Sequence, residues 1–214
     1  MEKLHWSLDG KKLLQVSDYI TLFGGIEMFI STIWNNLESY GVTTKFHGLT
    51  LPLSILKKLK VFFLPFTACN VISASQIILY SLFRKPDIVW FHGVSRYHGR
   101  LPIWCTKMFS SKKFMMYHDL WYFHPFPSSI TEEHQVLPRS YTNRIRMSKQ
   151  HKNSRFGRLA IRLKFLGTAF LRWTLLTTID KHLVPSEFMV QYLIDWGVEK
   201  SSITVLPHFI VGKS

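Results

Sequence analysis

The chain has 214 residues, of which 47% are hydrophobic and 19% are charged. This length and composition suit one globular domain with a sizeable core, and they exclude an intrinsically disordered chain. The charge is one-sided, because 27 Lys and Arg against 13 Asp and Glu give a formal net charge of +14. Such a balance favours an anionic partner, namely phosphate, nucleic acid or a membrane surface, without selecting among them.

The beginning of the chain shows the pattern of a strand, a glycine turn and an amphipathic helix. Residues 13–17 are a mostly apolar run typical of a short strand, and Gly24 and Gly25 follow a polar loop. The apolar residues of the helix fall on one face: Ile26, Ile30, Ile33 and Leu37. Gly41 suits its C-terminal cap. Glycines before a helix let the backbone approach an anion, but the GxGxxG and GxxxxGK[ST] patterns are missing, so neither NAD nor a Walker-type nucleotide site is indicated.

The next part of the chain contains two predicted strands with a helix between them. Residues 42–51 carry β-branched side chains that suit a strand, and residues 87–91 form a short apolar run typical of a buried parallel strand. Residues 61–82 are long and apolar enough to span a membrane, but a proline and several polar side chains interrupt the run. We therefore expect a well-buried helix beside the sheet over about 67–83, in preference to a membrane-inserted segment.

Two helices are expected in the second half, on either side of a long loop. The first covers residues 97–109, and its apolar face consists of Leu101, Trp104 and Met108. Residues 120–153 show no sustained period, which is typical of a functional or disordered loop. The second helix covers residues 155–178. Its apolar stripe consists of Phe156, Leu159, Leu163, Leu166, Phe170 and Trp173.

The order of strands and helices predicts the fold class. The remaining strands are expected at residues 112–117, 180–185 and 202–206. Ser186 is placed to cap a helix over 187–196, which Gly197 closes. Strands that alternate with helices imply an α/β fold, a doubly wound, Rossmann-like domain with a mostly parallel sheet over residues 1–206. Residues 207–214 have the composition of a linker or tail.

In an open parallel sheet, ligands bind outside the carboxyl ends of the strands. The residues expected at those ends are Asp18, Gly24, Gly25, His92, Gly93, His118, Asp119 and Ser186. A neutral imidazole accepts a proton or hydrogen-bonds a hydroxyl near pH 7, which suits a sugar or polyol. For His92 alone we favour a histidine that satisfies local backbone groups. For His118, which is followed by Asp119 and opens the long loop, we favour a functional role.

Other kinds of site have little support. His92 and His98 are six residues apart, as are His118 and His124, whereas metal ligands on one helix face are three or four apart. We therefore expect no metal. Both cysteines lie in apolar stretches, which is typical of reduced thiols in a core. The N-terminus has no secretory signal, so a cytoplasmic location is expected.

Basic residues are concentrated in residues 134–179, which contain ten Lys and Arg and no Asp or Glu. On the expected helix, Arg155, Arg158 and Arg162 flank the apolar stripe, as they would in a helix that lies on an anionic membrane. The alternative is a helix packed on the sheet with a solvated basic rim. No recognition helix or RNA-binding motif accompanies the charge, so no nucleic-acid partner is expected.

Five segments, in this order, resemble the N-terminal domain of a GT-B glycosyltransferase of the retaining family 4. They are LLQVSDYITLFGGIE, KPDIVWFHG, MMYHDLWYFHP, DKHLVPSEFMVQYLIDWG and SSITVLPHFI, which together span nearly the whole chain. The last segment differs slightly, with Pro207-His208 where the family usually has Pro-Asn. The resemblance implies the acceptor-side domain of an enzyme that moves a sugar from a nucleotide sugar to a glycan, polyol or lipid-linked acceptor, without a metal.

The resemblance also implies roles for individual residues. Gly24 and Gly25 would approach the donor diphosphate, His118 would lie beside the reacting sugar, and Asp119 would orient that region. Other residues expected on the donor-diphosphate or acceptor side are Glu27, His92 and Ser186. The second domain of the family, with its paired glutamates for the nucleotide sugar, is not among these residues. The chain is therefore expected to be inactive without that domain or a partner chain that supplies it. The alternatives are a non-catalytic membrane-docking or scaffold subunit and, with less support, a nucleic-acid-binding domain.

Overall fold

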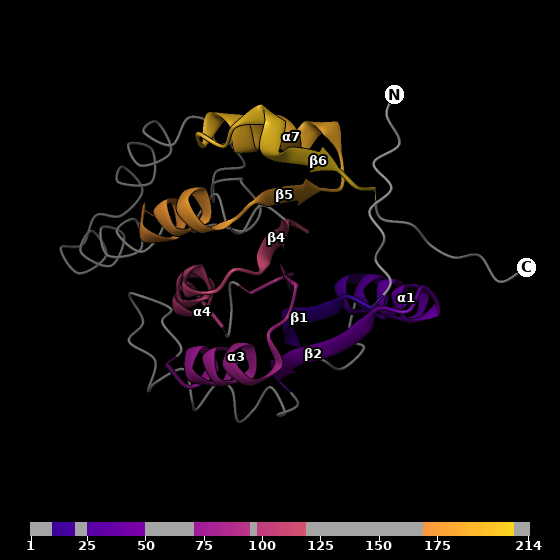
Figure 1. The fold of residues 1–214 in the computed structure, drawn as a ribbon. Coiled ribbons are helices and arrows are strands. Elements are labelled where there is room, and N and C mark those ends of the chain that lie inside the picture. The colour runs from indigo at the N-terminus through magenta and orange to yellow at the C-terminus, as the bar shows by residue number, and fades with distance from the viewer. Residues whose placement is uncertain (1–9, 20–24, 50–70, 95–97, 119–168, 208–214) are drawn as a thin grey trace, which may run out of the picture.

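The structure is a computed structural model that describes residues 10–19, 25–49, 71–94, 98–118 and 169–207 (Figure 1). The elements are, in chain order, β1 (Lys12–Tyr19), α1 (Gly25–Ser39), β2 (Thr43–Leu49), α3 (Val71–Arg84), β3 (Ile88–Phe91), α4 (Leu101–Cys105), the 3₁₀ turn η1 (Thr106–Met108), β4 (Lys112–Met116), β5 (Lys181–Val184), α7 (Glu187–Asp195), the 3₁₀ turn η2 (Lys200–Ser202) and β6 (Ile203–Val205). Residues 169–178 are also helical.

The described strands form one six-stranded sheet in the order β2-β1-β3-β4-β5-β6, and every neighbouring pair is parallel. This arrangement confirms the predicted doubly wound α/β fold, and each observed strand agrees with its predicted range to within two residues. β1 lies between β2 and β3, so the chain leaves β1 toward one side of the sheet and later returns on the other. Ligands in such sheets bind at this reversal of strand order.

The core has one layer on each face of the sheet. On one face, Phe29 and Ile33 of α1 pack against Leu13, Trp90 and Met116. The other face is covered by α3, α4, the helical residues 169–178 and α7 (Figure 1). These helices share a larger cluster of buried side chains. Its largest fully buried members are Trp196, Tyr117, Phe91, Leu14, Ile77, Ile103, Met115 and Leu175. Full burial of such side chains contributes about 1.5–3 kcal/mol each, so the sheet is held mainly by these two layers.

Two helices end in the same hydrogen-bonded cap, as the sequence predicts. At the end of α1, Val42 N–H donates to Leu37 O at 3.1 Å, and Gly41 has a φ of +74°. After α7, Val198 N–H donates to Leu193 O at 3.0 Å, around a glycine in the same left-handed region. The six-to-one bond and the positive φ define a Schellman cap, which satisfies carbonyls that the helix itself leaves unpaired.

Two aspartates fasten the amino ends of the strands, at the edge opposite the predicted site. Asp87, just before β3, accepts a hydrogen bond from the Lys12 backbone N–H at 2.9 Å. Asp180, just before β5, accepts the equivalent bond from Lys113 N–H at 2.7 Å. The Lys12 N–H, assisted by Lys11, holds the pKa of Asp87 below its ordinary value. These carboxylates therefore have a structural role.

The predicted burial of three helices is partly wrong. α3 flanks the sheet as expected, but it buries only the side that carries Ser73, Ala74, Ile77 and Ser81. α4 is shorter than predicted and continues as a 3₁₀ turn, and it buries Ile103 and Cys105. Two of the three residues predicted for its apolar face are instead exposed, with Trp104 at 41% and Met108 at 73%, while Leu101 is half-buried. A helical period read over thirteen residues does not hold once the helix tightens to three residues per turn.

In residues 169–178 the predicted buried side of the helix is also wrong. Trp173 of the predicted apolar stripe is 46% exposed, whereas Leu171 and Leu175, outside that stripe, are buried. The rest of this helix, the predicted loop 120–153 and the first half of the apolar run 61–82 lie outside the described residues. Among the helices that the structure describes, none is both long and apolar enough to cross a membrane.

Candidate functional site

Three polar residues meet on the α1 face of the sheet: two histidines that follow β3 and β4, and a glutamine within β1. His92 follows β3 directly, and its backbone N–H continues the ladder by donating to Val16 O of β1 at 2.8 Å. His118 follows β4 by two residues. Gln15 lies within β1, level with Trp90 of β3 in the register. Strand register therefore determines which of these side chains meet.

His92 contacts both Gln15 and His118. Its Nε2 lies 3.1 Å from Gln15 Oε1, and its Nδ1 lies 3.3 Å from His118 Nε2. Because a carbonyl oxygen only accepts, neutral His92 carries its proton on Nε2 and accepts through Nδ1. His118 then donates from Nε2, so its own lone pair is on Nδ1. Gln15 thereby fixes the tautomers of both histidines.

Aromatic rings surround this histidine pair. His92 is fully buried and stacks on Trp90, with ring centroids 4.9 Å apart and planes 29° apart. The His92 and His118 rings stack at 5.5 Å, and Phe29 of α1 meets His118 edge-on at 5.4 Å. Such contacts hold the rings in fixed orientations. His118 keeps partial exposure, so it is the member of the pair that a ligand can reach.

Two buried N–H donors beside the pair have no hydrogen-bond acceptor among the described residues: Gln15 Nε2 and Trp90 Nε1. These residues are register partners on neighbouring strands. A buried donor without an acceptor costs about 1–3 kcal/mol, which an oxygen atom of a water or ligand would recover. This face of the sheet thus offers donors as well as imidazole nitrogens.

A second polar group fixes the loops around the site. His98 is fully buried, and its Nε2–H donates to Ser17 O at 2.7 Å, while the Ser73 hydroxyl donates to its Nδ1 at 2.5 Å. The buried Asp18 accepts from His98 N–H at 3.0 Å, and Asp18 N–H donates to Gly93 O at 3.1 Å. These bonds tie the end of β1 to α3 and to the segment after β3. His98 therefore has a structural role, because both of its ring nitrogens are engaged.

The other predicted site residues lie at the same edge but do not join the histidine pair. Gly25 begins α1, and Glu27 is half-buried in the first turn, where the helix dipole favours a carboxylate. Ser186 follows β5 at the N-cap position of α7, with φ −156° and ψ 156°. Its predicted capping is wrong in one respect, since its side chain makes no cap hydrogen bond.

The remaining predicted site residues lie outside the described residues: Gly24, Asp119, Arg155, Arg158 and Arg162. The described parts of the chain contain no group of three or more His, Cys, Asp or Glu side chains that could hold a metal ion.

A buried pair lies behind the site, on the opposite face of the sheet. Tyr117 Oη and His182 Nδ1 are 2.8 Å apart, and their rings stack at 5.8 Å. Burial lowers the pKa of His182 to about 4 and raises the pKa of Tyr117 well above its ordinary value. Both side chains are therefore neutral near pH 7, and the pair belongs to the core.

Gln15, Ser73 and His98 were missed by the sequence-based site prediction. Gln15 offered a signal, because a polar residue within the apolar run LLQV of a parallel strand is buried and needs a partner. Ser73 and His98 offered none, since their contact joins residues 25 positions apart through the fold.

No family model matches the chain, and no curated protein matches it. Among solved structures, HepE of Anabaena in complex with UDP is similar with a TM-score of 0.44 and 10% identity, over 93% of this chain and 44% of HepE. The lipopolysaccharide outer core galactosyltransferase WaaB is similar with a TM-score of 0.43 and 14% identity, over 91% of this chain and 44% of WaaB. The transcription regulator CcpA of Lactococcus lactis has a TM-score of 0.32 and 8% identity, over 91% of this chain and 77% of CcpA. The chain thus spans less than half the length of HepE and WaaB, and these similarities concern the fold alone.

Proposed function

We propose that this chain is the acceptor-side half of a retaining, family 4-like glycosyltransferase, which moves a sugar from a nucleotide sugar to a glycan, polyol or lipid-linked acceptor. One observation carries the proposal: His118 and His92 meet at the carboxyl edge of the sheet, beside α1 and at the reversal of strand order. Ligands bind at this position in doubly wound folds, and imidazoles there suit the hydroxyl groups of a sugar. The five resembling segments assign the reaction class.

Each residue of the edge receives a role by its chemistry. The first backbone N–H groups of α1, from Gly25 on, have no partner within the helix and favour the donor diphosphate. His118 hydrogen-bonds a sugar hydroxyl, with its ring held by His92 and Phe29. Glu27 would repel a diphosphate at close range, so we assign it to acceptor hydroxyls.

Half of the contacts of such a site must come from elsewhere. A nucleotide sugar has a base, a ribose and a sugar ring, and the described edge offers groups for its phosphates and for one side of the sugar only. Catalysis requires both reactants to be held in line by preorganised groups. We therefore expect the 214-residue chain alone to bind nucleotide sugars weakly and to transfer no sugar, and we expect activity when a C-terminal donor-binding domain is supplied.

Binding can be tested by ¹H–¹⁵N NMR titration of the 214-residue chain with UDP-, GDP- and ADP-sugars and with inorganic phosphate as the reference. We expect small shifts at Gly25, His92 and His118 with a nucleotide sugar. Gly25→Val should abolish them, because a branched side chain blocks the approach of a phosphate to α1. Gly93→Ala is the matched control, since a Cβ there meets only Ile26 Cδ1 at 3.7 Å. Absence of shifts with every nucleotide sugar would contradict the donor site.

Activity can be tested with a donor-binding domain fused to the chain or added as a separate protein. Removal of a positioned general acid, base or hydrogen-bond donor lowers turnover by about 10²–10⁴, so His118→Ala should lower kcat within that range. Sugar transfer by the isolated 214-residue chain, free of other enzymes, would refute the half-enzyme proposal.

A further inference from the structure

Most of the large apolar side chains that the described residues expose lie on one face of the molecule. Nine of them belong to α3, α4, η1 and the helical residues 169–178, and we call them together the outer helical surface. They are Val71, Ile72, Leu79, Leu82, Phe83, Trp104, Met108, Trp173 and Leu176. These helices cover the same face of the sheet (Figure 1). Their inner sides share one cluster of buried side chains.

α3 has its more apolar side turned outward. The side against the sheet carries Ser73, Ala74, Ile77 and Ser81, three of which are small. The opposite side exposes five large apolar residues, with Phe83 at 81% and Leu79 at 53%. A surface helix normally shows the reverse, and a contiguous exposed apolar face marks an interaction site. Burial against the residues that the structure describes therefore does not explain the outer side of α3.

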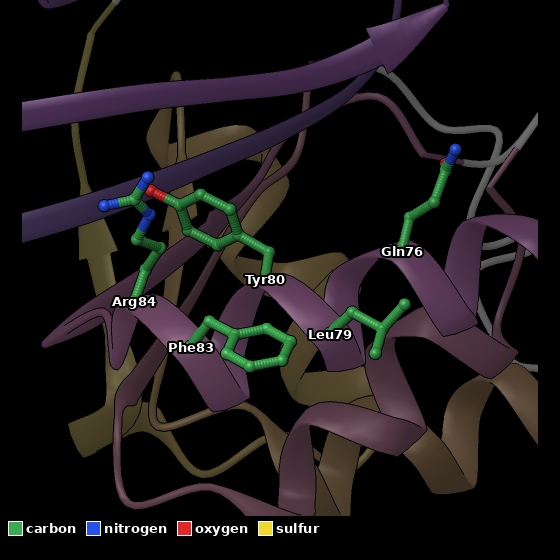
Figure 2. A pocket seen from close by; sticks show the side chains of 5 residues that line it. All are labelled: Gln76, Leu79, Tyr80, Phe83 and Arg84. Atoms are coloured by element: carbon green, nitrogen blue, oxygen red, sulfur yellow. The ribbon is translucent and has the colours of Figure 1, made fainter.

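The outer side of α3 also borders an open recess with a volume of about 600 Å³. It is lined by Gln76, Leu79, Tyr80, Phe83 and Arg84, and Figure 2 shows Arg84 extending beside the Tyr80 hydroxyl group. Burial, the larger of two opposing effects, raises the pKa of Tyr80. The recess thus combines apolar walls with a cation at one end.

The charge of the outer helical surface has one sign. Residues 39–86, 98–118 and 169–179 contain no Asp or Glu. Arg84, Lys85 and Lys107 are exposed beside the apolar side chains. The exposed acidic residues of the described chain lie on α1 and α7, directly before η2 and directly before β5, so none belongs to the helices that form the outer helical surface. A second copy that docked through the same surface would bring only like charges to it, so symmetric self-association through this surface is disfavoured.

We propose that the outer helical surface docks on an anionic lipid bilayer, with α3 lying in the plane of the interface. Apolar and tryptophan side chains would enter the boundary between headgroups and acyl chains, while Arg84, Lys85 and Lys107 contact anionic headgroups. This surface differs from the basic segment around Arg158 that the sequence suggests for membrane contact. The inference stands on exposure and charge alone, so it does not depend on the proposed transferase activity.

Vesicle co-sedimentation of the 214-residue chain tests the proposal. Vesicles of phosphatidylcholine with about 25% phosphatidylglycerol are compared with pure phosphatidylcholine, at about 0.05, 0.15 and 0.5 M NaCl. We expect binding to the anionic vesicles that weakens with salt, because the headgroup attraction is screened. Leu79→Glu with Phe83→Glu should reduce the partition coefficient by about tenfold or more, since it removes apolar contacts and adds repulsion. Leu79→Ser with Phe83→Ser should reduce it in the same direction without adding charge.

Met28→Glu with Tyr40→Glu is the matched control, because these residues are 59% and 70% exposed on α1 and directly after it, and α1 covers the opposite face of the sheet. The partition coefficient of the control should stay within about twofold of that of the unmodified chain, although the control carries the same two added charges as the test variant. Thermal melts of all variants verify folding. Equal losses in the test and control variants would overturn the proposal, as would the absence of binding to anionic vesicles. A dimer in sedimentation velocity that Leu79→Glu with Phe83→Glu dissociates would overturn it in favour of a second copy.

Discussion

The buried His182 should make the stability of this protein depend on pH. His182 is 2% exposed, and its Nδ1 accepts a hydrogen bond from the Tyr117 hydroxyl at 2.8 Å. Burial disfavours the charged imidazolium and lowers the pKa of His182 to about 4, from 6.5 for the unperturbed side chain. Protonation also removes the acceptor that Tyr117 uses. At a pH between these two pKa values, His182 is therefore neutral in the native state and protonated in the unfolded chain.

The size and sign of the effect follow from these two pKa values. Between pH 6.5 and about 4 the unfolded chain binds more protons at this site than the folded chain, so the free energy of unfolding falls as the pH is lowered through this range. The full stabilisation is present above pH 6.5, and the loss is complete near pH 4. The pKa values differ by about 2.5, and at about 1.36 kcal/mol per unit the loss is about 3 kcal/mol.

Urea unfolding of the 214-residue chain and of His182→Asn, at several pH values from 7.5 to about 4, measures this contribution. Asn keeps an acceptor near the position of Nδ1 but does not titrate, so the variant should lose about 3 kcal/mol less than the unmodified chain across the window. Tyr117→Phe is the control, because it removes the hydrogen bond and leaves the buried imidazole, and so it should retain the pH dependence. Parallel curves for the unmodified chain and His182→Asn would refute the reasoning, as would an NMR titration of His182 near pH 6.5.

Two further predictions concern a tautomer and a turn. Gln15→Leu removes the oxygen that accepts from His92 Nε2, so ¹⁵N NMR of the imidazole should show loss of the Nε2–H tautomer; an unchanged spectrum would exclude Gln15 as a positioning residue. Gly197→Ala should destabilise the fold more than Gly10→Ala in thermal melts. Both glycines have a positive φ, which costs about 1–2 kcal/mol for another residue, but only at Gly197 does a Cβ meet a side chain, Arg172 Nη2 at 3.0 Å. Equal destabilisation by Gly197→Ala and Gly10→Ala would mean that the Arg172 side chain moves away from the new Cβ without loss of stability.

The strands were predictable from the sequence, whereas the orientation of the helices was not. Runs such as LLQVS and DIVWF are buried from both sides in a parallel sheet, so composition and length alone identify them. A helix must in addition be assigned a buried side, and α3 offers apolar residues on both sides. Trp104 within α4 and Met108 in the 3₁₀ turn that follows are both exposed, against the predicted apolar face. The period of a short helix therefore does not determine which side packs.

The position of the candidate site was likewise predictable, but its contacts were only partly so. His92 and His118 both follow predicted strands, which places them at the carboxyl edge of any parallel sheet. His92 alone was interpreted as a residue that satisfies local backbone groups. The structure corrects this, because its two ring nitrogens contact the side chains of Gln15 and His118. Contacts of this kind depend on the order of the strands in the sheet, and no short stretch of the sequence determines that order.

Once strand order and register are known, the pairing of the histidines follows from alternation along the strands. Phe91 of β3 lies level with Met115 of β4, so His92 is level with the residue two positions before His118. Side chains two residues apart share a face, which places both histidines on the α1 side. A slip of β4 by one residue would exchange His118 for Tyr117 on that side. Tyr117 instead meets the buried His182 on the opposite face. The core contact that secures Tyr117 therefore also sets the face on which His118 is presented, and it connects the stability of β4 and β5 to the geometry of the site.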